Sequence, residues 1–340
     1  EADVVTGSSN RAALLSAVKE ALATGKRVVE ILPHQRGEKF EHMAVTGLRG
    51  RTRAFVKIED GCERFCSYCI IPKARGPVRS KPLEEIRAEL EGLARNGYRE
   101  AVLVGINLSS YGKDLGLRLI DAVQAACRVD GIERIRLGSL EPELLTAEDI
   151  RSMAAERKFC PQFHLSLQSG CDRTLRDMNR HYDAAEYTRI VSDIRAVFEN
   201  PSVTTDVMVG FAGETETDFA ESLAFVRKTG FAKAHVFSYS RRPGTAADKR
   251  PGQVPSAVKE SRSRRMIEAA DASRKEFLLS QLGRVEEVLI ETTRSPLGYE
   301  GFTKNYTPVY VDCDPAFCGQ IVKVRLEAVL EGHCVGAFQR

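Results

Sequence analysis

The sequence predicts an α/β fold built on a parallel sheet, followed by a small all-β barrel. Between about residue 50 and residue 240, six short apolar or β-branched segments alternate with helical segments. This alternation is typical of parallel strands joined by right-handed helical crossovers, in either an open doubly wound sheet or a partial barrel. Beyond Gly283, short strand-like segments are separated by glycine, proline and aspartate, which is typical of a small barrel.

Each of the six predicted strands is a short run of the kind that a buried parallel strand shows. They are expected at 55–58, 101–106, 134–140, 163–169, 203–211 and 234–239. In both parallel architectures, ligands bind at the carboxyl ends of the strands. The loops that directly follow these strands are therefore the places to look for function.

Capping residues mark the predicted helices between the strands. Pro82 is well placed to start one helix and Gly97 ends it, while Thr146 caps another. The helices are expected at 82–96, 115–129, 146–157, 174–199 and 216–228, with a long basic helix at 256–282. Together with the strands they predict six strand–helix units.

The ends of the chain predict two further parts. A helix at 11–23 with strands nearby indicates the tail of an N-terminal α/β domain within residues 1–49. The central barrel is expected at 50–281 and the small barrel at 282–340, with strands at 285–291, 298–302, 309–311 and 321–326. The chain does not begin with methionine, and residues 1–50 contain no cysteine.

Composition places the chain among globular proteins. Hydrophobic residues make up 43% and charged residues 29%, and neither a membrane-length apolar run nor a signal-peptide pattern is present. We therefore expect a cytoplasmic protein without membrane contact, in which thiols stay reduced and clustered cysteines indicate metal. Residues 233–276 hold eleven basic and five acidic residues, which would either attract a polyanion or form a solvated helix face.

Three cysteines follow the first predicted strand in a C-x3-C-x2-C arrangement, Cys62, Cys66 and Cys69. A structural zinc site usually takes four ligands in two pairs, and the sequence offers no second pair. A disulfide does not suit a reducing compartment, and three thiols beside Glu63 and Arg64 do not suit a core. An iron–sulfur cluster held by three thiolates, with one iron left open for a substrate, explains the pattern best.

The spacing, with Tyr68 before the third cysteine, resembles the radical S-adenosylmethionine superfamily. The resemblance implies a partial six-unit β/α barrel and one 4Fe-4S cluster whose open iron binds S-adenosylmethionine. It also implies that the reduced cluster cleaves this cofactor to a 5′-deoxyadenosyl radical that abstracts hydrogen.

Longer motifs resemble the methylthiotransferases within that superfamily. They are GCERFCSYCIIPKARGPVRS at 61–80, LGSLEP at 137–142, HLSLQSG at 164–170, MNRHY at 178–182, VMVGFAGETE at 207–216 and SYSRRPGTAA at 238–247. VGINLSSYGKDLG at 104–116 resembles the subgroup that acts on threonylcarbamoyladenosine in tRNA. The expected activity is therefore addition of a methylthio group to C2 of N6-threonylcarbamoyladenosine at position 37.

Two kinds of alternative remain open. Within the family, the substrate could be isopentenyladenosine in tRNA or an aspartate of a ribosomal protein. In another class, the chain would be a non-catalytic RNA-binding protein with zinc on its cysteines.

The resemblance implies a set of site residues as well. Side chains near the strand ends would bind the cofactor, namely Tyr68, Asn107, Ser139, Glu141, Ser166, Gln168, Arg180 and Gly210, with Arg180 pairing with its carboxylate. RNA contacts are expected at Arg75, Arg79, Arg241, Arg242, Phe302 and Lys304. His164 and His235 are expected to be hydrogen-bonded core residues.

The resemblance also implies partners and a missing part. The C-terminal barrel resembles a TRAM domain, and the partners would be a tRNA anticodon stem-loop and an electron donor such as flavodoxin or ferredoxin. The protein would be a monomer. In the family, an N-terminal domain carries a second 4Fe-4S cluster. We expect this chain to be truncated, so that it lacks the part of that domain that carries the second cluster.

Overall fold

The computed structural model describes residues 2–35, 37–41, 43, 47 and 51–339. Its centre is a partial barrel of parallel strands, which decides between the two architectures that the sequence left open. The strands are β3 (Arg53–Lys57), β6 (Glu100–Val104), β7 (Arg134–Leu137), β8 (Ser139–Leu140), β9 (Gln162–Leu165), β10 (Ser202–Val209) and β11 (Lys233–Ser238). They pair in two sheets, β3-β6-β7 and β8-β9-β10-β11, and only Gly138 separates β7 from β8.

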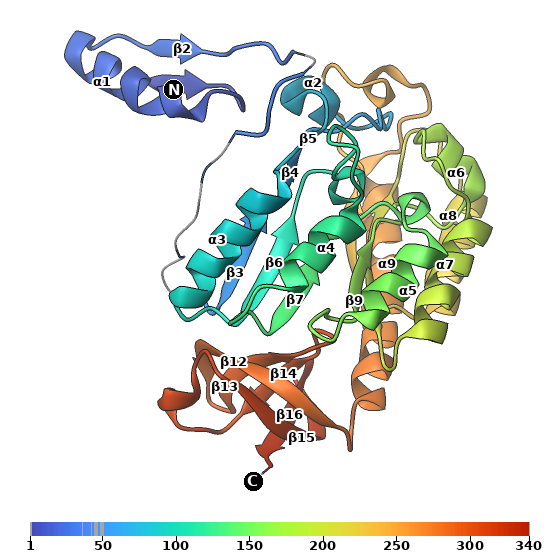
Figure 1. Cartoon of the computed structure of the whole chain (residues 1–340). Helices are drawn as coiled ribbons and strands as arrows, with labels where there is room; N and C mark the ends of the chain where they lie inside the picture. The colour runs from blue at the N-terminus through green and yellow to red at the C-terminus, as the bar shows by residue number, and fades with distance from the viewer. Residues whose placement is uncertain (1, 36, 42, 44–46, 48–50, 340) are drawn as a thin grey trace.

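Helices cover the outer face of this barrel (Figure 1). They are α3 (Leu83–Arg95), α4 (Leu119–Cys127), α5 (Ala147–Ala155), α6 (Asp172–Asp177), α7 (Ala184–Val197), α8 (Glu216–Thr229) and α9 (Ser256–Ser280). The single helix predicted at 174–199 is wrong, because it is two helices. Asn179, at φ 57°, ends the first one, and the turn that follows carries Arg180 and Tyr182 into the site.

The two faces of each strand differ in what they contact. On β3, Ala54 and Val56 are 1% and 0% exposed and belong to the main core, which lies between the strands and the helices. Phe55, between them, must point the other way because successive strand residues face opposite sides. The barrel therefore has an inner face, called the lumen here, that the main core does not fill.

The C-terminal residues form a closed five-stranded barrel, as predicted. Its strands are β12 (Val285–Ser295), β13 (Gly298–Thr303), β14 (Pro308–Val311), β15 (Ile321–Leu330) and β16 (His333–Phe338). Strand β16, which closes the barrel between β14 and β15, was not predicted from the sequence. Glu331 and Gly332 both have positive φ, so a two-residue turn typical of hairpins was the available signal.

This small barrel lies against the amino-terminal ends of the central strands, below β3, β6 and β7 in Figure 1. Arg134 donates to the carbonyl oxygens of Phe302 and Glu287, at 3.1 and 2.7 Å. The Tyr306 ring lies under two guanidinium groups, those of Arg53 at 4.9 Å and Arg136 at 4.6 Å. These contacts close the end of the lumen opposite the cysteine loop.

The N-terminal residues form a small unit beside the barrel (Figure 1). Strands β1 (Val4–Thr6) and β2 (Val28–Glu30) pair in parallel, with helix α1 (Leu14–Thr24) between them in sequence. Two shorter elements flank the cysteine loop, the β4–β5 hairpin (Glu59–Asp60 and Arg79–Ser80) and α2 (Ile71–Arg75). Within the described residues, no helix has both the length and the apolar character needed to cross a membrane.

Candidate functional site

The cysteine loop leaves β4 through a glycine that no other residue could replace. Gly61 has φ 92°, and a Cβ there would lie 1.9 Å from the carbonyl oxygen of Pro77. The Cys62 amide donates to the carbonyl oxygen of Gly76 at 3.0 Å, and the Cys69 amide donates to that of Cys66 at 3.0 Å. Backbone geometry, rather than side-chain packing, therefore fixes the positions of the thiols.

The turn after α6 supports the loop from its other side. The Asn179 side-chain amide donates to the carbonyl oxygen of Phe65 at 3.0 Å, and Phe65 has φ 52°. The Ser67 amide donates to the carbonyl oxygen of Met178 at 2.9 Å. Residues more than 100 positions apart thus form one rigid support for the three cysteines.

The three thiols are a donor set that suits an iron–sulfur cluster. Each is partly exposed, and burial, with charges on Cys66 and Cys69, raises the pKa of Cys62 to about 11. Because these groups interact electrostatically, the three thiols lie near one another. Three thiolates on one loop can hold an iron–sulfur cluster.

Arg180 connects the loop to the strand ends. Its guanidinium donates to Cys66 Sγ at 3.2 Å and forms an ion pair with Glu141, and it also reaches the Ser166 carbonyl oxygen at 3.3 Å. Arg180 is thus paired with Glu141, and its pairing with a cofactor carboxylate remains a prediction. Tyr182 reinforces the arrangement by donating to the same Ser166 carbonyl at 2.5 Å.

Beside Cys69 lies a cavity of about 330 Å³. Its lining includes Tyr68, Gln168, Met208 and Phe237. Gln168 has φ 64°, and its buried Oε1 has no hydrogen-bond partner among the described atoms. A buried, strained polar group aimed at a cavity suits a ligand that supplies the missing donor.

The remaining predicted cofactor residues divide into two groups. Asn107 is buried with an unpartnered Oδ1, and Ser139 is exposed at the start of β8. Both remain open for ligand contact. Gly210 does not, since its amide donates to Glu214 at 2.7 Å and the space beside its Cα holds the Lys259 side chain.

Comparison with known proteins identifies the family to which this chain belongs. The sequence profile described as "Radical SAM superfamily" matches residues 56–226, from β3 to α8. The chain belongs to the radical SAM superfamily. The superfamily implies a 4Fe-4S cluster and S-adenosylmethionine, which the three cysteines and the cavity beside them fit.

Curated relatives identify a narrower family within this superfamily. A protein of Caldicellulosiruptor saccharolyticus is 38% identical over 95% of this chain and 69% of its own length. Another, from Pelotomaculum thermopropionicum, is 35% identical over 98% of this chain and 75% of its own length. Both are named tRNA-2-methylthio-N(6)-dimethylallyladenosine synthase. The chain is therefore a radical SAM protein of the tRNA methylthiotransferase family.

A solved structure supports the fold alone. The radical S-adenosylmethionine methyltransferase TsrM from Kitasatospora setae, solved with tryptophan and a SAM analog, has a TM-score of 0.50 and 16% identity. The match covers 58% of this chain and 38% of that one.

These relatives overturn the predicted threonylcarbamoyladenosine subgroup, because they are named for dimethylallyladenosine. The stretch that carried the prediction forms a 3-10 turn at Leu108–Ser110. Just after it, Tyr111 donates to the Lys81 carbonyl at 2.7 Å and the Gly112 amide donates to Ser80 Oγ at 2.8 Å. These two contacts are packing interactions within the radical SAM barrel.

The predicted RNA-binding residues are scattered. Arg241 and Arg242 are exposed after β11. Arg79 is 4% exposed and pairs with Asp60 and Glu38, at 3.6 and 3.5 Å, while Arg75 lies 3.6 Å from the same Asp60. This placement does not favour a phosphate contact for Arg79.

Phe302 and Lys304 lie at the junction between the two barrels. Phe302 stacks on Tyr306 with ring centroids 4.6 Å apart, and the Lys304 ammonium donates to the Arg157 carbonyl. Both side chains therefore contribute to docking the small barrel. RNA contacts at either position remain a prediction.

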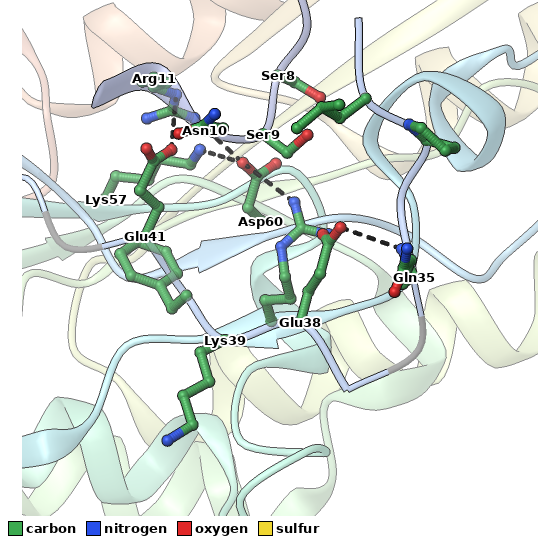
Figure 2. Close-up of a pocket in the computed structure, with 14 residues that line it drawn as sticks. Ser8, Ser9, Asn10, Arg11, Gln35, Glu38, Lys39, Glu41, Lys57 and Asp60 are labelled. Atoms are coloured by element: carbon green, nitrogen blue, oxygen red, sulfur yellow. Dashed lines mark hydrogen bonds and ion pairs between the residues drawn. The ribbon is translucent and has the colours of Figure 1, made fainter. Parts of the chain in front are cut away.

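A polar pocket of about 420 Å³ lies between N-terminal residues and the strands β3, β4 and β5, next to the cysteine loop in sequence (Figure 2). Asp60 accepts from Arg11 at 3.2 Å and from Lys57 at 2.5 Å, and its other oxygen accepts from the Gly61 amide at 2.9 Å. Because Gly61 begins the loop, this ion-paired network stabilises the loop from the outside.

The positions of His164 and His235 in the lumen were not predicted from the sequence. His164 was expected to be hydrogen-bonded, and it contacts Thr204 Oγ1 at 3.0 Å and Asp206 Oδ2 at 3.2 Å. His235, also expected in the core, is exposed in the lumen. Alternation along β9 to β11 was the available signal, since it places these residues on the face opposite the core.

Proposed function

We propose that this chain is a radical SAM methylthiotransferase that acts on N6-dimethylallyladenosine in tRNA. The observation that carries the proposal is the likeness to relatives of that name over 95% or more of the chain. The three-cysteine loop at the mouth of a lumen supports it. Dimethylallyl is the isopentenyl group of the alternative that the sequence left open.

Different residues of the chain would have different roles in this reaction. Cys62, Cys66 and Cys69 would hold the cluster, which when bound with S-adenosylmethionine supplies a 5′-deoxyadenosyl radical that abstracts hydrogen. Arg180 holds Cys66 Sγ in place through a hydrogen bond of 3.2 Å. Gln168, with an unpartnered Oε1, would receive a polar group of the cofactor. The lumen behind the cavity then receives the adenine.

Hydrogen transfer from the substrate tests the proposal. The reconstituted chain is incubated with dithionite, S-adenosylmethionine and an anticodon stem-loop with dimethylallyladenosine deuterated at C2. We expect deuterium in the 5′-deoxyadenosine, measured by mass spectrometry, because the radical would take the C2 hydrogen. This readout does not require the sulfur to be inserted.

Two controls make the test specific. The same stem-loop with deuterated threonylcarbamoyladenosine should give much less transfer, and Cys66→Ala should abolish cofactor cleavage with either RNA. Equal transfer from both nucleosides would contradict the proposed substrate. Cofactor cleavage without any transfer would contradict tRNA as the substrate.

A further inference from the structure

Two phenylalanine side chains on the edge strands of the partial barrel are exposed to solvent. Phe55 on β3 is 38% exposed and Phe237 on β11 is 40% exposed. Strands β3 and β11 are the first and last of the parallel series, so the side opening of the barrel lies between them. Exposed aromatic side chains at the opening of a barrel can form a binding site for a ligand or partner.

Both side chains point into the lumen. Ala54 and Val56 flank Phe55 and belong to the core, and Val236, next to Phe237, packs against the same core. Phe237 also lines the cavity that holds Tyr68 and Gln168. An apolar group bound at Phe237 would therefore lie beside the predicted cofactor site.

Three cations on β3 and β7 already have carboxylate partners. Arg53 pairs with Glu291 at 2.8 Å and Arg136 with Glu100 at 2.9 Å. Lys57, two residues beyond Phe55, pairs with Asp60 at 2.5 Å. A substrate carboxylate could pair with any of these three cations only by displacing its present partner.

The opposite wall of the lumen is polar. His164 and Asp206 form a pair at 3.2 Å, and Asp206 is in register with His235 on β11. These groups lie two residues before Met208 and Phe237 along their strands, further from the cysteine loop. The lumen thus offers hydrogen-bonding groups for a base or ribose and, separately, aromatic surface for an apolar substituent.

We propose that Phe55 and Phe237 determine the preference for an apolar N6 substituent by contacting the dimethylallyl group at the barrel opening. This inference rests on the proposed function, which names the substituent but not the residues that select it. A threonylcarbamoyl group carries a carboxylate, and the aromatic side chains offer it no partner.

Binding measurements test this residue assignment. Three fluorescent anticodon stem-loops that differ only at position 37, with adenosine, dimethylallyladenosine or threonylcarbamoyladenosine, are titrated with the reconstituted chain and S-adenosylmethionine. Burial of about two methylene equivalents predicts about tenfold tighter binding of the dimethylallyl form than of the unmodified form. The double variant Phe55→Ser/Phe237→Ser should reduce this preference, the ratio of the two affinities, to about twofold or less.

Two further variants complete the experiment. Val197→Ser, at a residue 39% exposed at the end of α7, removes apolar surface outside the lumen and should keep the preference. Phe55→Lys should raise affinity for the threonylcarbamoyl form relative to the dimethylallyl form.

The outcomes separate the two proposals. If the double variant keeps the wild-type preference, the residue assignment is overturned and the proposed function stands. If the wild-type chain does not prefer the dimethylallyl form, the proposed substrate itself is overturned.

Discussion

At the residue scale, Glu59 is a buried carboxyl that forms no ion pair among the described residues. Its side chain is fully buried, Oε2 accepts from the Asn107 amide at 2.7 Å, and Oε1 has no partner among the described atoms. Burial raises the pKa of Glu59 from about 4.5 to about 8, despite the hydrogen bond from Asn107. Between these values the folded chain binds the extra proton, so its stability must fall as the pH rises.

Glu59→Gln should remove this pH dependence. For the wild-type apoprotein, Glu59 alone contributes a loss of up to about 1.4 kcal/mol of unfolding free energy per pH unit in that window. Urea unfolding from about pH 5 to about pH 8.5 would measure the slope. Glu133→Gln, which changes an exposed pair with Arg99, is the matched control. An equal slope in Glu59→Gln and wild type would show that Glu59 is ionised throughout.

Arg180 and Glu141 form the second residue-scale feature, a largely buried ion pair. Arg180→Ala would leave Glu141 partly buried without its partner, and we expect a loss of about 2–3 kcal/mol in unfolding free energy. Arg180→Ala/Glu141→Ala should recover part of that loss. Additive effects in this double-mutant cycle would mean that the pair does not couple.

At the element scale, the cysteine loop depends on one backbone conformation. Gly61 and Gly97 both have positive φ, 92° and 87°, but only a Cβ at Gly61 would collide with backbone. Gly97→Ala should therefore cost about 1 kcal/mol, the usual penalty for that conformation. Gly61→Ala should cost more and should also displace Cys62.

Iron content separates these two variants. After anaerobic reconstitution, we expect Gly97→Ala to bind about four irons per chain, as the wild type would, and Gly61→Ala to bind far less. Circular dichroism would show that both variants keep their helices. Full iron binding by Gly61→Ala would mean that the β4–β5 hairpin adapts to the new Cβ.

At the scale of the whole molecule, the two barrels are joined by an aromatic and guanidinium stack. Tyr306→Ala removes the ring that lies between Arg53 and Arg136, which should cost about 1–3 kcal/mol and let the small barrel separate. Calorimetry should then resolve two unfolding transitions. Tyr310→Ala, which removes a ring stacked on His333 within the small barrel, should destabilise that barrel without weakening its docking.

The sequence by itself determined the order of the elements and the presence of three cysteines on one loop. The periodicity of short apolar strands and capped helices is local, so the six parallel units were predicted within a few residues. Local spacing also predicted Cys62, Cys66 and Cys69 as cluster ligands, because ligands on one loop need no information about distant segments.

Only the tertiary structure decided which side chains meet. The turn after α6 places Arg180 against Glu141 and Cys66, which lie 39 and 114 positions away, and the sequence did not predict these two partners. Phe302 and Lys304, which were predicted to contact RNA, lie where the two barrels dock, and that location was not predicted. The partners of a side chain depend on how distant strands assemble, and local sequence patterns do not encode that assembly.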